Sequence, residues 1–199
     1  MTDDASRDAL RAELRAELLA MAAEDRRVRA ELEAAGELSG GYAPRMEAVH
    51  RANAARLRAL VAAHGWPTRA VAGDDGAEAA WLIVQHAIGE PAFLRATLPV
   101  LWDAAARGDV PAWQAAMLED RIRAFEGRPQ RYGTQLHPDA DGWLRPHPID
   151  DPDGVEARRA AVGLEPLAER LARAGREDVG DRAKYEREYH AWLRRVGWR

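Results

Sequence analysis

The stretch from Trp113 to Gln135 most constrains the fold, because it places charges on the apolar face of a predicted helix. At about 100° per residue, one broad apolar arc is formed by Met117, Leu118, Ile122 and Phe125. Arg121 falls inside this arc and Asp120 lies at its edge. A buried charge is costly unless it is paired and hydrogen-bonded. We therefore expect Asp120 and Arg121 to find polar partners, and the nearest candidates are Gln130, Tyr132, Thr134 and Gln135.

Most of the chain shows the three-to-four-residue apolar spacing of amphipathic helices. The predicted helices cover residues 3–35, 44–64, 75–88, 91–107, 111–126, 155–162, 166–174 and 181–196. Residues 36–43 are predicted as a break and residues 66–76 as a loop. After Gly127 the period changes to two, which predicts a β-hairpin with its turn at 138–142. The fold class is therefore mainly α, a bundle-like single domain with a small β-hairpin after the fifth helix.

The predicted organisation has three parts. Residues 1–36 form a long N-terminal helix, residues 44–175 a core helical domain with its hairpin near 130–148, and residues 178–199 a C-terminal amphipathic helix packed on the core. The first helix has only a narrow apolar seam. Such a seam fits packing along the domain, and it also fits a homodimer contact through the N-terminal helix.

Composition excludes several classes of protein. The chain has no cysteine, which excludes disulfides and thiolate metal sites and suits the cytoplasm. Its net charge of −4, with both signs interleaved, indicates no nucleic-acid partner. No stretch reaches the ~20 apolar residues of a membrane span, and the charged start lacks the apolar run of a signal peptide. We expect a cytoplasmic protein without a membrane partner.

Familiar catalytic and metal motifs are absent from the sequence. It contains no glycine-rich phosphate loop, no G-x-S-x-G and no H-E-x-x-H. His86 and Glu90 are four residues apart, but zinc needs three or four ligands. The acidic group at 150–153 lacks the spacing of a calcium loop, and helix capping explains it better. The sequence therefore predicts no metal and no cofactor.

The helix predicted at 75–88 is apolar almost all round from Ala79 to Ile88, so Gln85 and His86 have no face for water. A histidine in a protein core is usually neutral and hydrogen-bonded on both nitrogens. A histidine beside a carboxylate can also act as a general base near neutral pH. Both interpretations of His86 remain open.

Together these residues form a candidate site. His86 and Asp120 are the candidate catalytic acid–base pair, and Arg121 suits a carboxylate or phosphate. The candidate ligand-binding residues are Gln85, Arg121, Gln130, Tyr132, Thr134, Gln135 and Trp66. They predict a pocket for a small ligand with an acidic or amide group, with hydrolase-like acid–base catalysis. The alternative is a non-enzymatic interaction module that uses the N-terminal or C-terminal helix, in which the polar groups satisfy one another and only specify the fold.

Five segments carry a resemblance to a known family. They are HGWP (64–67), AAWLIVQHA (79–87), LEDRI (118–122), QRYGTQ (130–135) and HPIDDPDGVEARRAAVGLEPL (147–167). In order and spacing, they resemble a family of small bacterial proteins without an established activity, over about residues 44–168. The resemblance implies these signature positions: Gly65, Trp66, Pro67, Gln85, His86, Asp120, Arg121, Gln130, Tyr132, Gly133, Thr134, Gln135, Pro148, Ile149, Arg159 and Gly163. Ile88 and Gly89 depart from the pattern, since relatives often have an acidic residue there.

Overall fold

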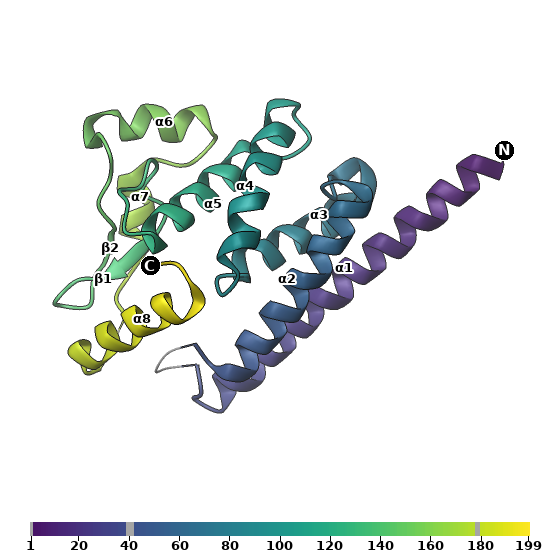
Figure 1. Cartoon of the computed structure of the whole chain (residues 1–199). Helices are drawn as coiled ribbons and strands as arrows, with labels where there is room; N and C mark the ends of the chain where they lie inside the picture. Colours follow the sequence, from purple (N-terminus) through teal and green to yellow (C-terminus); the bar gives the residue numbers. More distant parts are fainter. Residues whose placement is uncertain (1, 39–41, 178–179) are drawn as a thin grey trace. The chain divides into compact units, whose positions relative to one another are not determined.

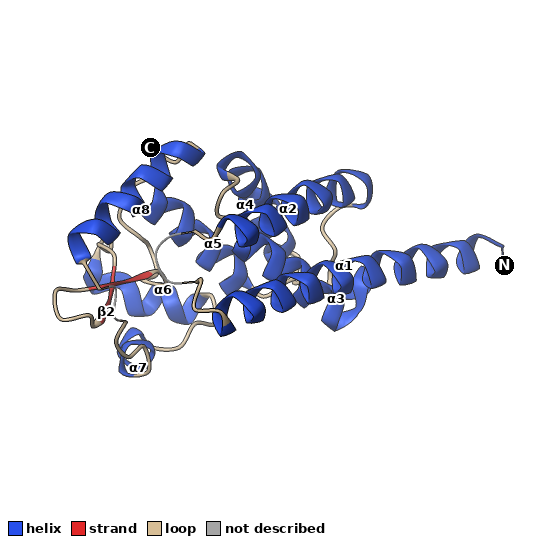
Figure 2. Cartoon of the chain, turned by 90° about the horizontal axis from the view of Figure 1, so that it is seen from below, coloured by secondary structure: helices blue, strands red, loops and turns tan. Residues whose placement is uncertain are grey.

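The computed structural model of the chain describes residues 2–38, 42–177 and 180–199 (Figure 1). The fold is mainly α, with one two-stranded hairpin after the fifth helix, as predicted (Figure 2). The α-helices in the described ranges are α1 (Thr2–Ala34), α2 (Pro44–His64), α3 (Arg69–His86), α4 (Pro91–Ala106), α5 (Ala112–Phe125), α6 (Val155–Ala161), α7 (Leu167–Ala172) and α8 (Arg182–Val196). The strands are β1 (Leu136–Pro138) and β2 (Leu144–Pro146), and a 3₁₀ turn, η1 (Pro152–Gly154), precedes α6.

The chain divides into two compact units. Unit 1 contains residues 2–38 and 42–110, with helices α1–α4, and unit 2 contains residues 111–177 and 180–199, with the hairpin and α5–α8. Positions 39–41 of the predicted break and positions 178–179 of the predicted C-terminal segment lie outside the described residues. Among the residues that the structure covers, we find no helix with the length and apolarity needed to cross a bilayer.

Unit 1 is built on the seam of α1, which packs along α3 and α2. The buried seam residues are Leu14, Leu18, Ala22, Val28 and Leu32. Asn53 contributes to the register of α1 against α2, because its Nδ2 donates to the carbonyl oxygen of Met21 at 3.2 Å. Residues 5–13 of α1 are exposed, and Figure 1 shows this end of α1 running past α2 and α3.

The prediction of a loop at residues 66–76 is confirmed for residues 66–68 and wrong from Arg69 onward. Helix α3 begins at Arg69 and is interrupted at Gly73, whose backbone (φ 73°, ψ 172°) is not helical. The early turn forms because Ala72 and Trp66 are buried in the core of unit 1, which outweighs the loop-forming composition around them. The predicted restart at Asp75 agrees with the structure, since its Oδ1 accepts a hydrogen bond from the backbone N–H of Gly76 at 2.8 Å.

In unit 2 the chain runs from α5 through the hairpin, α6 and α7 to α8. The strands are antiparallel and pair Leu136 with Pro146 and Pro138 with Leu144, so the turn lies where the change of period predicts it. Helix α8 begins at the N-cap Asp181, whose side chain accepts from the backbone N–H of Lys184. The two helices meet through aromatic rings, with Phe125 5.5 Å from Trp192 between ring centroids.

Candidate functional site

Three helices of unit 1 each bring one side chain that can bind a metal to the same point: Asp25 from α1, His50 from α2 and His86 from the end of α3. Their ligand atoms all lie within 4.8 Å of one another. His86 Nδ1 is 2.9 Å from both carboxylate oxygens of Asp25. His50 Nε2 is 3.1 Å from Oδ2 of the same carboxylate. We call these three residues the His–His–Asp cluster.

Helical periodicity explains why polar side chains meet inside an apolar core. Asp25 stands three residues from Ala22 and from Val28, so it lies on the buried seam of α1. His50 stands four residues after Met46 and three before Asn53, on the buried face of α2. Consequently Asp25 is 1% exposed and His50 8% exposed, whereas His86, at the end of its helix, is 27% exposed. The cluster is therefore buried on one side and accessible at His86.

The carboxylate of Asp25 is ionised. Burial alone would raise its pKa, but the closeness of His50, at 3.1 Å, and the hydrogen bond from His86 outweigh burial and hold the pKa well below the usual range. Asp25 therefore offers a negatively charged oxygen between two imidazole rings, whose centroids are 5.0 Å apart.

Tyr42 orients the buried imidazole. Its hydroxyl is hydrogen-bonded to Nδ1 of His50 and lies 3.5 Å from the carbonyl oxygen of His86. Burial raises the pKa of Tyr42, so the hydroxyl keeps its single proton at neutral pH. If the hydroxyl donates to Nδ1 of His50, the neutral ring carries its proton on Nε2, beside Asp25; if it donates to the carbonyl of His86, Nδ1 carries the proton and Nε2 is an acceptor.

The Nε2 atom of His50 lacks a hydrogen-bond partner among the described residues. It is buried and has no such partner within the described chain, although it lies 3.1 Å from Oδ2 of Asp25. Buried polar groups are nearly always hydrogen-bonded, and an exception calls for an explanation such as an ion. A cation between His50 and Asp25 would supply the missing partner.

The distances in the cluster fit such a cation. Ligands held at about 2.0–2.2 Å from one ion lie about 2.8–3.1 Å apart along the edges of an octahedron and about 3.3–3.6 Å apart along those of a tetrahedron. The carboxylate contacts of 2.9 Å to His86 and 3.1 Å to His50 match octahedral edges and are shorter than tetrahedral ones, and the three ligand atoms lie within 4.8 Å of one another. Three protein ligands with an open fourth position are typical of catalytic rather than structural sites.

The other predicted residues of unit 1 lie around this cluster or in the core. Gln85 precedes His86 and is half-buried, and Trp66 is buried in the core. Glu90, considered above as a zinc partner of His86, instead contacts Arg51 and Arg58, at 3.3 and 3.5 Å.

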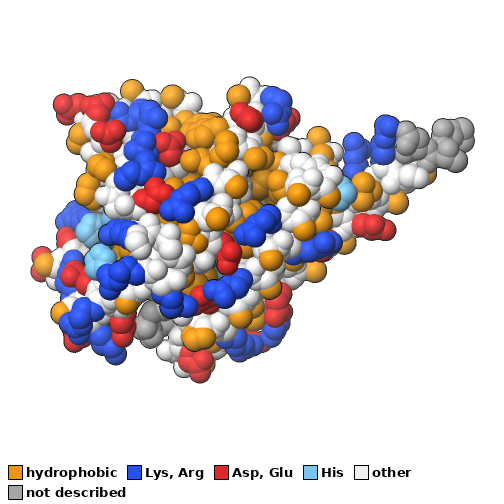
Figure 3. Space-filling view, in the orientation of Figure 1, with side chains coloured by type: hydrophobic (Ala, Val, Ile, Leu, Met, Phe, Trp, Pro, Cys, Tyr) orange, Lys and Arg blue, Asp and Glu red, His pale blue; other side chains and the backbone are white. Residues whose placement is uncertain are grey.

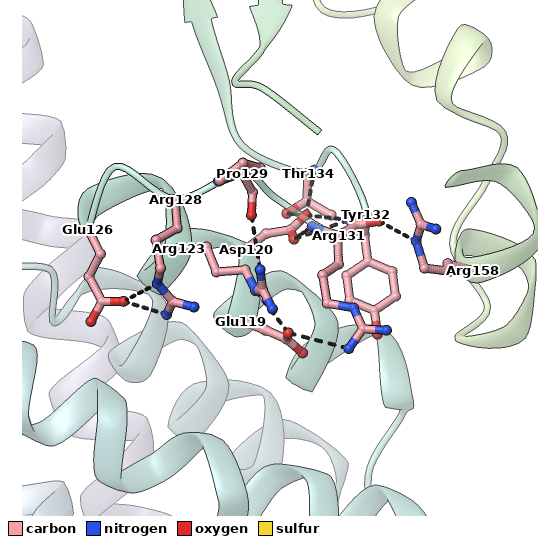
Figure 4. Close-up of polar contacts among 10 residues, drawn as sticks. All are labelled: Glu119, Asp120, Arg123, Glu126, Arg128, Pro129, Arg131, Tyr132, Thr134 and Arg158. Carbon is pink, nitrogen blue, oxygen red and sulfur yellow. Dashed lines mark hydrogen bonds and ion pairs between the residues drawn. The ribbon is translucent and has the colours of Figure 1, made fainter. Parts of the chain in front are cut away.

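In unit 2, Asp120 receives hydrogen bonds from the turn that follows α5 (Figure 4). Its carboxylate accepts from the backbone N–H groups of Arg131 at 2.7 Å, Tyr132 at 3.1 Å and Thr134 at 2.9 Å. The hydroxyl of Thr134 donates to it at 3.0 Å. Burial raises the pKa of Asp120, and these donors oppose that rise. The carboxylate is thereby satisfied without a ligand.

The remaining polar groups of this turn also pair with one another. Arg121 Nε donates to Gln135 Oε1 at 3.0 Å, and burial lowers the pKa of Arg121 to about 10. Gln130 is fully buried and donates to the carbonyl oxygens of Gln135 and His147 at 3.0 and 2.9 Å. Gly133 has the predicted positive φ, 67°. The carbonyl of Tyr132 accepts from the buried Arg159 at 2.6 Å.

Six predicted residues thus come together in unit 2, namely Asp120, Arg121, Gln130, Tyr132, Thr134 and Gln135. Gln85, His86 and Trp66 belong to unit 1, so a pair between His86 and Asp120 stays a prediction. Sequence reasoning missed Asp25 and His50. Both interrupt an apolar stripe, and this was the signal that could have found them.

The fold and these contacts define a mainly helical protein with a buried polar cluster in unit 1 and a satisfied polar turn in unit 2. The chain belongs to the Family of unknown function (DUF6624), whose model matches residues 12–181. This confirms the family resemblance at the level of the family. No curated protein and no solved structure matches the chain.

Proposed function

We propose that this protein binds a divalent first-row transition ion through Asp25, His50 and His86, and uses it on a small ligand with an acidic or amide group. The observation that carries the proposal is the buried Nε2 of His50, which faces an ionised carboxylate without a hydrogen bond. Imidazole and carboxylate together favour ions such as Zn²⁺ or Fe²⁺ over Mg²⁺ or Ca²⁺.

The surroundings of the cluster support this role. Tyr42 holds Nδ1 of His50, as outer partners commonly hold the second nitrogen of a ligating histidine. His86 is the accessible ligand, so a small molecule can approach the ion from its side. An ion with an open position polarises a carboxylate or amide carbonyl as a Lewis acid. This is the hydrolase-like chemistry that the sequence predicts, with Asp25 in place of Asp120 as the carboxylate beside His86.

The first test is metal binding by the full chain. After treatment with a chelator, Zn²⁺ should bind with one ion per chain in calorimetry and should raise the thermal midpoint. His50→Gln should weaken binding at least ~100-fold, because one of three ligands is lost. His64→Gln is the matched control, since His64 is an exposed histidine on the same helix. Circular dichroism checks that each variant is folded.

Equal Zn²⁺ binding by the wild type and by His50→Gln would refute the site. The hydrolytic part is tested with N-acetylglycine, which carries both an amide and a carboxylate, by measuring release of the amine. Activity should require the ion, disappear in His50→Gln and persist in His64→Gln. Zn²⁺ binding without amine release would keep the ion site and refute hydrolysis of this substrate.

The interaction module remains a second candidate, favoured by one observation. Residues 5–13 of α1 are exposed, and Leu10 is 45% exposed on this segment. If α1 mediates a homodimer, Leu10→Ser should shift the chain to monomer in sedimentation equilibrium. An unchanged mass would exclude a contact through Leu10.

A further inference from the structure

Unit 2 contains a cavity of about 560 Å³ that none of the roles above uses. It lies among the end of α5, the hairpin and α8. Its lining includes His137, His147, Arg182, Tyr185, Tyr189 and Arg199. Figure 3 shows histidine and arginine side chains gathered together over the hairpin and α8. Ligand cavities commonly measure about 300–1,000 Å³, so this one suits a small molecule.

The charges that line the cavity are mostly positive. Three arginines and one carboxylate, that of Glu186, line it, and Glu186 is paired with Arg182 at 2.8 Å. Arg128 is paired with Glu126. Arg199 has no carboxylate partner among the described residues. The cavity therefore carries an excess of positive charge that an anion would balance.

Arg199 is held in position by the end of α5. Its Nε donates to the carbonyl oxygen of Phe125 at 2.8 Å, and its Nη2 donates to that of Ala124 at 3.0 Å. Cations are favoured at a helix C-terminus, which explains this placement. Nη1 makes no hydrogen bond to the described part of the chain, so this edge of the guanidinium remains available to an oxyanion.

Flat rings form part of the lining. The rings of His137 and His147 are 4.6 Å apart, and those of Tyr185 and Tyr189 are parallel within 2° at 6.4 Å. Burial, together with the charges of His137 and Arg199, lowers the pKa of His147 to about 4, so its ring is neutral at pH 7 and both donates and accepts hydrogen bonds.

We propose that this cavity binds a small aromatic oxyanion, with its phosphate or carboxylate group on Arg199 and its ring among the histidine and tyrosine rings. The proposal goes beyond the metal site and does not depend on it, because all the lining residues belong to unit 2.

The test uses the full chain, with phenyl phosphate and benzoate as probes and benzyl alcohol as the neutral control. At least one anion should bind with one-to-one saturation in calorimetry, and benzyl alcohol at least ~10-fold more weakly. Arg199→Gln should weaken anion binding at least ~10-fold, since a charged hydrogen bond is lost. Arg187→Gln is the matched control, because Arg187 is an exposed arginine of α8 outside the lining.

A second readout needs no variant. In the wild-type chain, the bound anion should raise the pKa of His147, followed by its ring proton resonances as pH is varied, because a nearby negative charge favours the charged ring. Any one of four results would overturn the proposal. Neither anion saturates, benzyl alcohol binds as tightly as the anions, Arg187→Gln loses as much affinity as Arg199→Gln, or the titration of His147 is unchanged. If Arg199→Gln does not fold, the titration of His147 decides.

Discussion

Replacing Asp120 by asparagine tests whether this carboxylate has a structural role. The substitution keeps the shape of the side chain but turns one acceptor oxygen into an N–H₂ donor. One oxygen can still accept from the backbone of Arg131 and Tyr132. The new N–H₂ group then faces the backbone N–H of Thr134, which loses its acceptor.

The expected cost follows from these contacts. An unsatisfied buried donor costs about 1–3 kcal/mol, and hydrogen bonds to a charged group are worth about 1 kcal/mol more than those to a neutral one. Removing the buried charge recovers part of this free energy, because burial disfavours the charged form and already raises the pKa of Asp120. We expect Asp120→Asn to lower the free energy of unfolding by about 2–4 kcal/mol.

Urea unfolding followed by circular dichroism measures this change, and amide hydrogen exchange at Thr134 locates it. The control is Glu119→Gln, the same chemical change one residue earlier, where the amide oxygen can still accept from Arg123, now 3.1 Å from the carboxylate. A loss below about 0.5 kcal/mol in Asp120→Asn, or one no larger than in the control, would refute the structural role. Asp120 would then be free for the catalytic role predicted from the sequence.

Three further predictions concern unit 2. Arg159→Leu should cost about 1–3 kcal/mol in urea unfolding, because it leaves one buried carbonyl oxygen, that of Tyr132, and one part-buried, that of Glu165, without their donor. Gly133→Ala should cost about 1 kcal/mol more than Gly163→Ala in thermal unfolding, since both have positive φ but only the Cβ at 133 would meet Ile149, at 2.9 Å. His147 has its pKa lowered from 6.5 to about 4, so the unfolded chain binds the proton first as pH falls. The free energy of unfolding should therefore fall by ~2 kcal/mol from pH 6.5 to pH 4, and His147→Gln should remove this part of the slope.

The polar turn of unit 2 could be predicted because its partners are close in sequence. Asp120, on the buried face of its helix, needs hydrogen-bond donors nearby, and the structure confirms that Thr134 and Tyr132 supply them. The identity of the donors could not be predicted. Three of the four are backbone N–H groups, whose directions depend on the conformation of the turn around Gly133.

The sequence marks Asp25 and His50 as polar residues on apolar stripes, but it could not predict that they meet His86, because the three residues are distant in sequence. Asp25 and His86 are separated by 61 positions, and each alone is one polar residue on an apolar helix face. Only the register of α1 against α2 and α3 brings them together. Asn53 contributes to that register, and its own partner, the carbonyl of Met21, carries no signal in the sequence.

The contrast between two buried carboxylates supports the proposal that Asp25, and not Asp120, is the functional one. Asp120 and Asp25 are 0% and 1% exposed, so burial alone does not separate them. Asp120 has four donors in good geometry, its pKa is raised, and a ligand would have to displace hydrogen bonds that the fold requires. Asp25 has its pKa lowered between two imidazoles, and one of these, His50, is left with a buried nitrogen that no described group satisfies. A carboxylate that already accepts four hydrogen bonds stabilises a turn. An ionised carboxylate beside a nitrogen without a hydrogen-bond partner still has a position for a cation.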